Sequence, residues 1–171
     1  MAVIAAATSS GPRVLVIADW RADPHAVIAA CVRRAIPGRA RFALVVPAWL
    51  HGLDWAGDPH ASRPCAARQL ETLLRLAAAA GLEVELAAVG DPDPTSAVGD
   101  ALRTFAAREI LVCRDRPGRA HPLDLPHRLR RMTGLPVDSA RPRVARSERR
   151  RRGAVLGGGH CIARHAGVSG S

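Results

Sequence analysis

Residues 81–115 restrict the fold of this chain most, because they combine a strand, a turn, a helix and a second strand without interruption. Residues 82–86 alternate apolar and acidic side chains, the period of a strand with one buried face, and residues 87–89 are expected to carry that strand into the interior. Gly90 then permits a turn that a Cβ would oppose. Residues 110–113 form an apolar run without alternation, which favours a parallel strand buried on both faces.

Aspartate followed by proline, a combination typical of helix starts, occurs at Asp93 and at Asp23. Residues 64–80 form the most regular amphipathic helix, and Gly81 is expected to cap its C-terminal end. With the apolar runs, these patterns give an alternation of strand and helix that ends on a fifth strand. The expected strands cover residues 13–18, 41–47, 82–89, 109–113 and 135–138, and the expected helices cover residues 24–36, 64–80, 94–105 and 125–133.

This order predicts an α/β fold, a Rossmann-like three-layer α/β/α domain around a five-stranded parallel sheet with strand order 3-2-1-4-5. We expect one such domain over residues 13–138, preceded by a disordered N-terminus at residues 1–12. Residues 139–171 are rich in arginine and glycine and lack apolar periodicity, so they are expected to form a disordered tail. Residues 48–63 exceed the usual length of a connection, which indicates a lid-like or disordered loop.

The formal net charge of +10 suggests nucleic acid or an anionic surface until its distribution is considered. The tail holds eight of the 25 basic residues against a single acidic one, whereas the domain is close to neutral. Every basic side chain other than histidine is arginine, a bias that a GC-rich genome explains. The absence of lysine excludes a P-loop lysine, a Schiff base and a Ser-Lys dyad.

No constellation of catalytic or metal-binding residues is recognisable in the sequence. Cys31, Cys65, Cys113 and Cys161 lie far apart, without the Cys-x-x-Cys spacing of a zinc ribbon or a redox pair. No Gly-x-Ser-x-Gly motif occurs, and no apolar stretch approaches the length of a membrane span. We therefore expect a cytoplasmic protein without enzymatic activity that binds no metal.

Candidate binding residues lie where the predicted strands end, because open α/β sheets bind ligands at the carboxyl ends of their strands. These ends contribute Asp19, Val46 and the pair Gly90 and Asp91. Asp19 could accept a hydrogen bond from a ribose hydroxyl or an amino group, or it could simply cap a turn. Gly90 and Asp91 could line a nucleotide cleft, or they could serve turn chemistry alone.

A loop with several arginines follows the fourth predicted strand. Arg114, with Arg116 and Arg119 on either side of Gly118, could neutralise a phosphate, or these residues could be ordinary surface arginines. Trp49, after the second strand, could stack on a base or could cover the edge of the sheet. The pattern alone leaves both pairs of alternatives open.

The chain resembles the universal stress protein family over about residues 12–138. The resemblance rests on a first strand ending in Asp19, a second strand closing on Val45 and Val46, and residues 90–92, Gly-Asp-Pro, between a Gly-Leu strand and an Ala-rich helix. It implies a five-stranded Rossmann-like domain that is frequently dimeric and that binds ATP in some members.

The same resemblance assigns roles to four candidate residues. Asp19 matches the acidic residue near ribose and adenine, Val46 the residue whose backbone contacts the base, and Gly90 and Asp91 the wall of the cleft. ATP-binding members also follow the fourth strand with Gly-x-x-Gly, nine residues, then Gly and Ser or Thr, whereas the corresponding loop here contains only Gly118. The expected affinity for ATP or AMP is therefore weak or absent.

Three hypotheses for function follow. The first is a non-catalytic regulatory domain of the universal stress protein type that binds adenine nucleotide weakly or not at all. The second is an interaction module that forms a homodimer and leaves its cleft empty. The third is a nucleic-acid contact made by residues 141–152, which would be non-specific and salt-dependent but would lack interleaved aromatic residues for base stacking.

Overall fold

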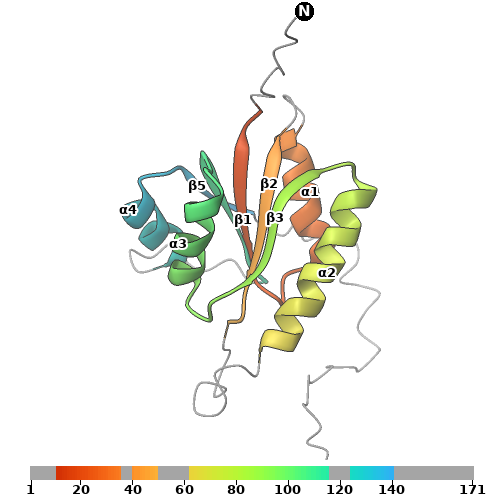
Figure 1. The fold of residues 1–171 in the computed structure, drawn as a ribbon, viewed down its shortest axis with the longest axis horizontal. Coiled ribbons are helices and arrows are strands. Elements are labelled where there is room, and N and C mark those ends of the chain that lie inside the picture. Colours follow the sequence, from red (N-terminus) through yellow and green to blue (C-terminus); the bar gives the residue numbers. More distant parts are fainter. Residues whose placement is uncertain (1–10, 36–39, 50–61, 116–123, 141–171) are drawn as a thin grey trace, which may run out of the picture.

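The computed structural model describes residues 11–35, 40–49, 62–115 and 124–140, which form a parallel five-stranded sheet covered by helices on both faces (Figure 1). The strand order β3-β2-β1-β4-β5 is the predicted one, so the expected three-layer α/β/α fold is confirmed. The elements along the chain are β1 (Arg13–Ala18), α1 (Pro24–Ala35), β2 (Arg41–Pro47), α2 (Arg63–Ala79), β3 (Glu83–Gly90), α3 (Pro94–Thr104), β4 (Glu109–Cys113), α4 (Leu125–Thr133) and β5 (Val137–Ala140).

Two hydrophobic clusters lie on opposite faces of the sheet. Alternate residues of β1, β2 and β4 pack with α1 and α2 on one face, and the residues between them pack with α3 and α4 on the other. Val16 and Ile17 are neighbours in β1 and belong to different clusters, and both are almost completely buried. The non-alternating apolar runs of the sequence therefore correspond to strands buried on both faces, as parallel strands between two helical layers must be.

The strand β3 departs from expectation. Residues 87–89 were predicted to enter the interior, but Ala87 is exposed and Val89 is only half-buried. The reason is topological, because β3 is the edge strand and pairs only with β2. Its outer side therefore lacks the neighbouring strand that would have buried it.

The ends of the helices follow the local chemistry of the sequence. Asp93 is the N-cap of α3, and its side chain accepts from the Ser96 N–H. Gly81 directly follows the C-cap of α2 with a φ of +68°, a conformation in which a Cβ would be strained, and turns the chain into β3. The predicted helix starts and the use of glycine after α2 are confirmed.

The last strand begins and ends two residues later than the sequence pattern indicated. Leu135 packs partly buried against the cluster under α4, and its N–H donates to Thr133 Oγ1 rather than to a strand. The Pro136 carbonyl accepts from the Ile110 N–H, and the ladder with β4 starts at Val137. Leu135 and Pro136 thus belong to the turn between α4 and β5.

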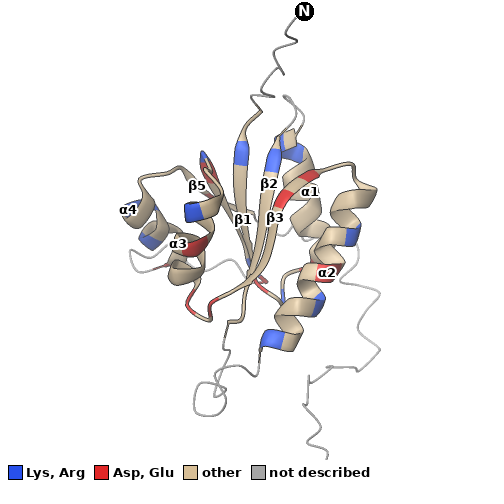
Figure 2. Cartoon of the chain, viewed as in Figure 1, with Lys and Arg blue, Asp and Glu red and all other residues tan. Residues whose placement is uncertain are grey.

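Ion pairs gather where the strands begin. Figure 2 shows that arginine and acidic residues lie at the start of β1, β2 and β3, and their side chains form ion pairs. Glu85 binds both Arg13, at 2.8 Å, and Arg41. On the other side of the sheet Arg34 binds Glu109 at 3.0 Å and also contacts Asp138. We call the end of the sheet where the strands begin the amino edge, and the end where the strands finish the carboxyl edge.

In the part of the chain that the structure describes, no helix is long and apolar enough to cross a bilayer. The predicted tail beyond residue 140, the predicted lid-like loop over most of its length, and residues 1–10 fall outside the described residues. The nucleic-acid hypothesis, which depends on residues 141–152, therefore stays a prediction.

Candidate functional site

The parallel register brings the candidate residues to one edge of the sheet. Ile17 of β1 lies beside Val45, and Pro47 lies beside Gly90, so β1, β2 and β3 end at a common level. Gly90 and the residue after β1, Asp19, are separated only by β2, which corresponds to about 10 Å for two strand spacings. The carboxyl edge is therefore the candidate site.

Asp19 is 4% exposed and stands at the centre of this edge. Its N–H donates to the Cys113 carbonyl at 2.8 Å, which ties the end of β1 to the end of β4. Its carboxylate accepts from the Arg21 N–H at 3.0 Å, and its carbonyl accepts from the Ala22 N–H at 2.9 Å. The turn-capping interpretation of Asp19 is thus confirmed, and a contact with ribose stays a prediction.

Gly90 is required by close packing rather than by an unusual backbone. Its φ is not positive, but a Cβ there would lie 2.6 Å from Ala97 Cβ and 3.0 Å from Val45 Cγ1. The start of α3 therefore approaches the end of β3 more closely than any other residue type would allow. Asp91, which follows, is exposed, and its Oδ1 accepts from the Asp93 N–H at 2.8 Å.

Val46 is completely buried, and its side chain belongs to the cluster under α1 and α2. Its backbone continues the ladder beside Val89. The Val46 side chain therefore does not contribute to the surface of the carboxyl edge, and any contact with a ligand would have to come from its backbone, as the resemblance implies.

Arg114 and Trp49 meet at the carboxyl edge. The Arg114 guanidinium carbon lies 5.1 Å from the centroid of the Trp49 ring, a cation–π arrangement. The Trp49 carbonyl accepts from Trp20 Nε1 at 2.9 Å. Trp49 packs partly buried against the cluster under α3 and α4, and both of its expected roles stay predictions. Gly118 and the neighbouring loop arginines lie outside the described residues.

Sequence reasoning missed the contribution of Trp20. It directly follows Asp19, so its position after a central strand was a signal that it would lie at this edge. Its indole packs partly buried against the cluster under α1 and α2, and its hydrogen bond anchors the chain after β2. Trp20 therefore fixes where Trp49 can lie.

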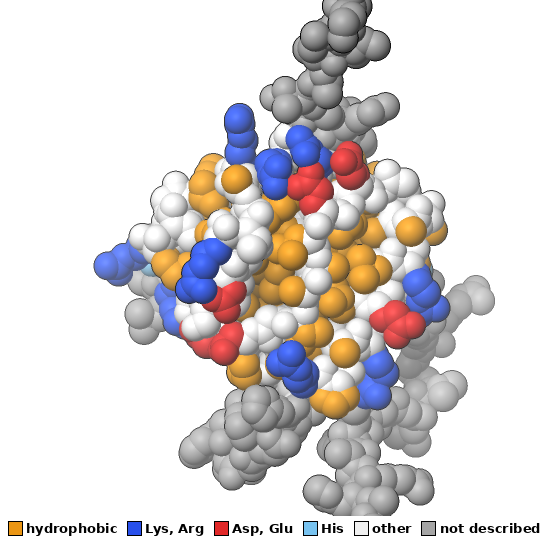
Figure 3. Space-filling view, in the orientation of Figure 1, with side chains coloured by type: hydrophobic (Ala, Val, Ile, Leu, Met, Phe, Trp, Pro, Cys, Tyr) orange, Lys and Arg blue, Asp and Glu red, His pale blue; other side chains and the backbone are white. Residues whose placement is uncertain are grey.

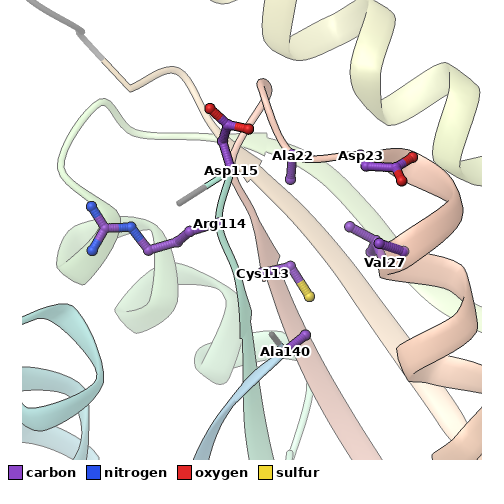
Figure 4. Close-up of a pocket in the computed structure, with 8 residues that line it drawn as sticks. Ala22, Asp23, Val27, Cys113, Arg114, Asp115 and Ala140 are labelled. Carbon is purple, nitrogen blue, oxygen red and sulfur yellow. The ribbon is translucent and has the colours of Figure 1, made fainter. Parts of the chain in front are cut away.

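A small pocket opens beside this edge, between α1 and the ends of β4 and β5 (Figure 4). Its volume is about 60 Å³, well below the roughly 300 Å³ or more of typical small-molecule sites. In Figure 4 the Arg114 side chain extends away from Ala22, Asp23 and Val27. The residues that line the pocket are Ala22, Asp23, Ala26, Val27, Cys113, Arg114, Asp115 and Ala140.

The buried thiols beside this pocket are poor nucleophiles. Burial raises the pKa of Cys31 to about 12, although Arg34 and Arg33 oppose the effect. Burial also raises the pKa of Cys113 well above its ordinary value. The thiolate is the reactive species, and both thiols are protonated at neutral pH. We therefore interpret both cysteines as core residues. Within the described ranges, no group of three or more His, Cys, Asp or Glu residues is placed to hold a metal ion.

Comparison with known proteins identifies structures with the same fold but no relative by sequence. No model of a protein family matches the chain, and no curated protein sequence matches it either. Solved structures do match. A protein from the universal stress protein family of Burkholderia pseudomallei is 21% identical, with a TM-score of 0.50 over 74% of this chain and 93% of that one.

Two further structures support the same conclusion. A universal stress protein from Archaeoglobus fulgidus is 16% identical, with a TM-score of 0.53 over 76% of this chain and 93% of its own. A universal stress protein family protein from Arabidopsis thaliana, solved with AMP bound, is 12% identical, with a TM-score of 0.52 over 75% of this chain and 90% of its own. The chain therefore has the fold of the universal stress proteins, as the sequence resemblance predicted.

Proposed function

We propose that this chain is a divergent universal stress protein, a non-catalytic cytoplasmic domain that binds adenine nucleotide weakly at its carboxyl edge. The observation that carries the proposal is the buried carboxylate of Asp19 at the end of the central strand, beside the end of β4 and two strand spacings from Gly90. This is the switch point of the sheet, where the connections of β1 and β4 run to opposite faces and where such folds bind ligands.

Adenosine monophosphate is the ligand that we favour. The structural neighbour from Arabidopsis thaliana was solved with AMP bound. Asp19 would accept a hydrogen bond from a ribose hydroxyl, and Arg114, one residue beyond β4, is a cation at this edge that could meet a phosphate. One side-chain cation replaces the backbone amides of a glycine-rich loop, so additional phosphates would gain little and the affinity would be weak.

The absence of catalysis is part of the proposal. The thiols of Cys113, at the end of β4, and of Cys31, in α1, are buried and protonated, which supports a binding role rather than nucleophilic chemistry. A domain of this kind would act by changing its stability or its contacts when nucleotide binds. A nucleotide at 100 times its Kd adds about 2.7 kcal/mol to the free energy of unfolding.

Isothermal titration calorimetry of the full chain with AMP and ATP tests the proposal. Asp19→Asn keeps an oxygen that can accept from the Arg21 N–H and removes the charge, so it should weaken AMP binding about tenfold while leaving the fold intact. Asp100→Asn, on the exposed side of α3, is the matched control and should leave binding unchanged. Absence of binding heat and of any thermal shift at millimolar nucleotide would reject the proposal.

A second candidate function is a homodimeric interaction module. Figure 3 shows hydrophobic side chains gathered along the middle of the face that presents β3. Val84 and Leu86 of β3 are only half-buried, and Leu74 of α2 is 36% exposed. Sedimentation velocity distinguishes the two candidates. The interaction module would be favoured if the wild type forms a dimer, Leu86→Arg dissociates that dimer, and the protein does not bind nucleotide.

A further inference from the structure

The contact between Trp49 and Arg114 crosses the end of the central strand. Trp49 lies two residues beyond β2, and Arg114 lies one residue beyond β4. In the sheet, β1 separates these two strands. With 5.1 Å between the guanidinium carbon and the ring centroid, the two side chains bridge β2 to β4 just beyond Ala18.

The side of the sheet on which they meet follows from the alternation of the strand. The Cys113 side chain belongs to the cluster under α1 and α2, so the next side chain, that of Arg114, points to the opposite side. Trp49 packs partly buried against the cluster under α3 and α4, which is that opposite side. Figure 4 agrees, since the Arg114 guanidinium extends away from Ala22, Asp23 and Val27 beside α1.

The indole is held more firmly than the guanidinium. The backbone of Trp49 is fixed by the hydrogen bond from Trp20 Nε1, and its ring packs against a hydrophobic cluster. Arg114 is half-buried, and a stack of this kind at a partly exposed site is worth a factor of about 2 to 5 in an equilibrium constant. A planar ligand could therefore replace the guanidinium on the indole at modest cost.

We propose that the stack of Arg114 on Trp49 determines which ligands bind at the carboxyl edge. A nucleobase must displace the guanidinium from the indole, and the released Arg114 then binds the phosphate of the same ligand. A nucleoside without phosphate must also displace the guanidinium, but it offers no phosphate to which the released Arg114 could bind. The site therefore selects phosphorylated nucleosides, and this inference rests on the proposed nucleotide-binding function.

Two ligands and two variants test the proposal by calorimetry. In Arg114→Gln, adenosine should bind about 2 to 5 times more tightly than to the wild type, because the stack no longer competes with the base. AMP should bind about tenfold more weakly, because the charge that would meet the phosphate is gone. Arg21→Gln is the matched control, because Arg21 also stacks on a tryptophan. Its guanidinium carbon lies 5.5 Å from the centroid of the Trp20 ring, and Arg21 follows β1 rather than β4.

Opposite changes for the two ligands in Arg114→Gln, with both affinities unchanged in Arg21→Gln, are the expected result. If the affinities for both ligands fall equally, or if the affinity for adenosine does not change, Arg114 does not compete with the base and the proposal is wrong. Far-UV circular dichroism and the melting temperature of each variant show that the fold is retained.

A measurement without ligand separates this inference from the proposed function. Labelling with 5-fluorotryptophan gives one ¹⁹F NMR signal for each of the three tryptophans, which single Trp→Phe variants assign. Arg114→Gln should shift the Trp49 signal and increase its solvent isotope effect, whereas Arg21→Gln should not. An unchanged Trp49 signal would show that the stack does not form. A shifted signal with no binding of either ligand would reject the proposed function, and the selection with it, while the stack remains.

Discussion

The two ends of the sheet are closed by different chemistry. At the amino edge, Glu85 pairs with both Arg13 and Arg41, and the Arg13 guanidinium carbon also lies 4.4 Å from the centroid of the Phe105 ring. At the carboxyl edge, the buried Asp19 carboxylate accepts from a backbone N–H, and Arg114 stacks on an indole.

The difference indicates which end has room for a ligand. The arginines of the amino edge pair with carboxylates of the domain itself, so we infer that this edge serves stability. At the carboxyl edge, Asp19 is held by a hydrogen bond within a turn and Arg114 by a stack on Trp49. Polar groups that are held by turns and by stacking can exchange those contacts for contacts with a ligand.

The largest expected effect is that of a single methyl group at the carboxyl edge. Gly90→Ala places a Cβ 2.6 Å from Ala97 Cβ, so α3 or β3 must shift, and we expect a loss of about 1–3 kcal/mol in the free energy of unfolding. Gly99→Ala in α3 is the matched control, because its Cβ meets nothing within 4 Å and a helical alanine should stabilise by about 0.5–1 kcal/mol. Urea denaturation measures both, and equal effects would contradict the packing at Gly90.

The amino edge is tested by removing its shared acid. Glu85→Gln leaves Arg13 and Arg41 without their common carboxylate, and we expect a loss of about 1–2 kcal/mol, between the values for exposed and buried pairs. Asp100→Asn, which breaks the exposed pair with Arg103, should change the free energy of unfolding by less than about 0.5 kcal/mol. A loss that disappeared entirely in 1 M salt would show that Glu85 acts only as a surface charge.

A smaller effect is expected at the N-cap of α3. Burial raises the pKa of Asp93, but hydrogen bonds from Thr95 and Ser96 outweigh it and hold this pKa below its ordinary value of 3.8. The stabilisation by the ionised cap is therefore complete above about pH 5 and is lost progressively as the pH falls through the lowered pKa. Asp93→Ala should cost about 1 kcal/mol at pH 7.

The matched control for the cap is Asp93→Asn, which keeps an accepting oxygen at every pH. The wild type should be more stable than Asp93→Asn at pH 7 and should lose that advantage as the pH falls from about 5 through the lowered pKa of Asp93. Thermal unfolding followed over this range measures the difference. A constant difference across the range would contradict an ionised cap with a lowered pKa.

Most of the fold could be predicted because its signals are local. Non-alternating runs such as residues 110–113 identified strands buried on both faces, and Asp93 with Pro94 identified a helix start. The errors arose where neighbours in space decide. No strand pairs with the outer side of β3 at Ala87, and Leu135 packs within a turn. The neighbouring residues in the sequence indicate neither arrangement.

The candidate site could be predicted in part for the same reason. The register of a parallel sheet brings the residue after β1 and the residues at the end of β3 to one edge, so Asp19 and Gly90 were predictable from strand order. The stack of Arg114 on Trp49 joins segments that are distant in the chain and depends on which face each side chain reaches. The turn role of Asp19 was one of two open alternatives until its partners were seen.

The most direct test of the account is a titration of the ¹⁵N-labelled full chain with AMP, followed by ¹H–¹⁵N NMR. The account predicts dose-dependent shifts of the amides of Asp19, Gly90 and Arg114 at the carboxyl edge, while the amides of Arg13 and Arg41 at the amino edge stay unchanged. The absence of shifts at millimolar AMP, or shifts that centre on the amino edge, would contradict a nucleotide site at the switch point of the sheet.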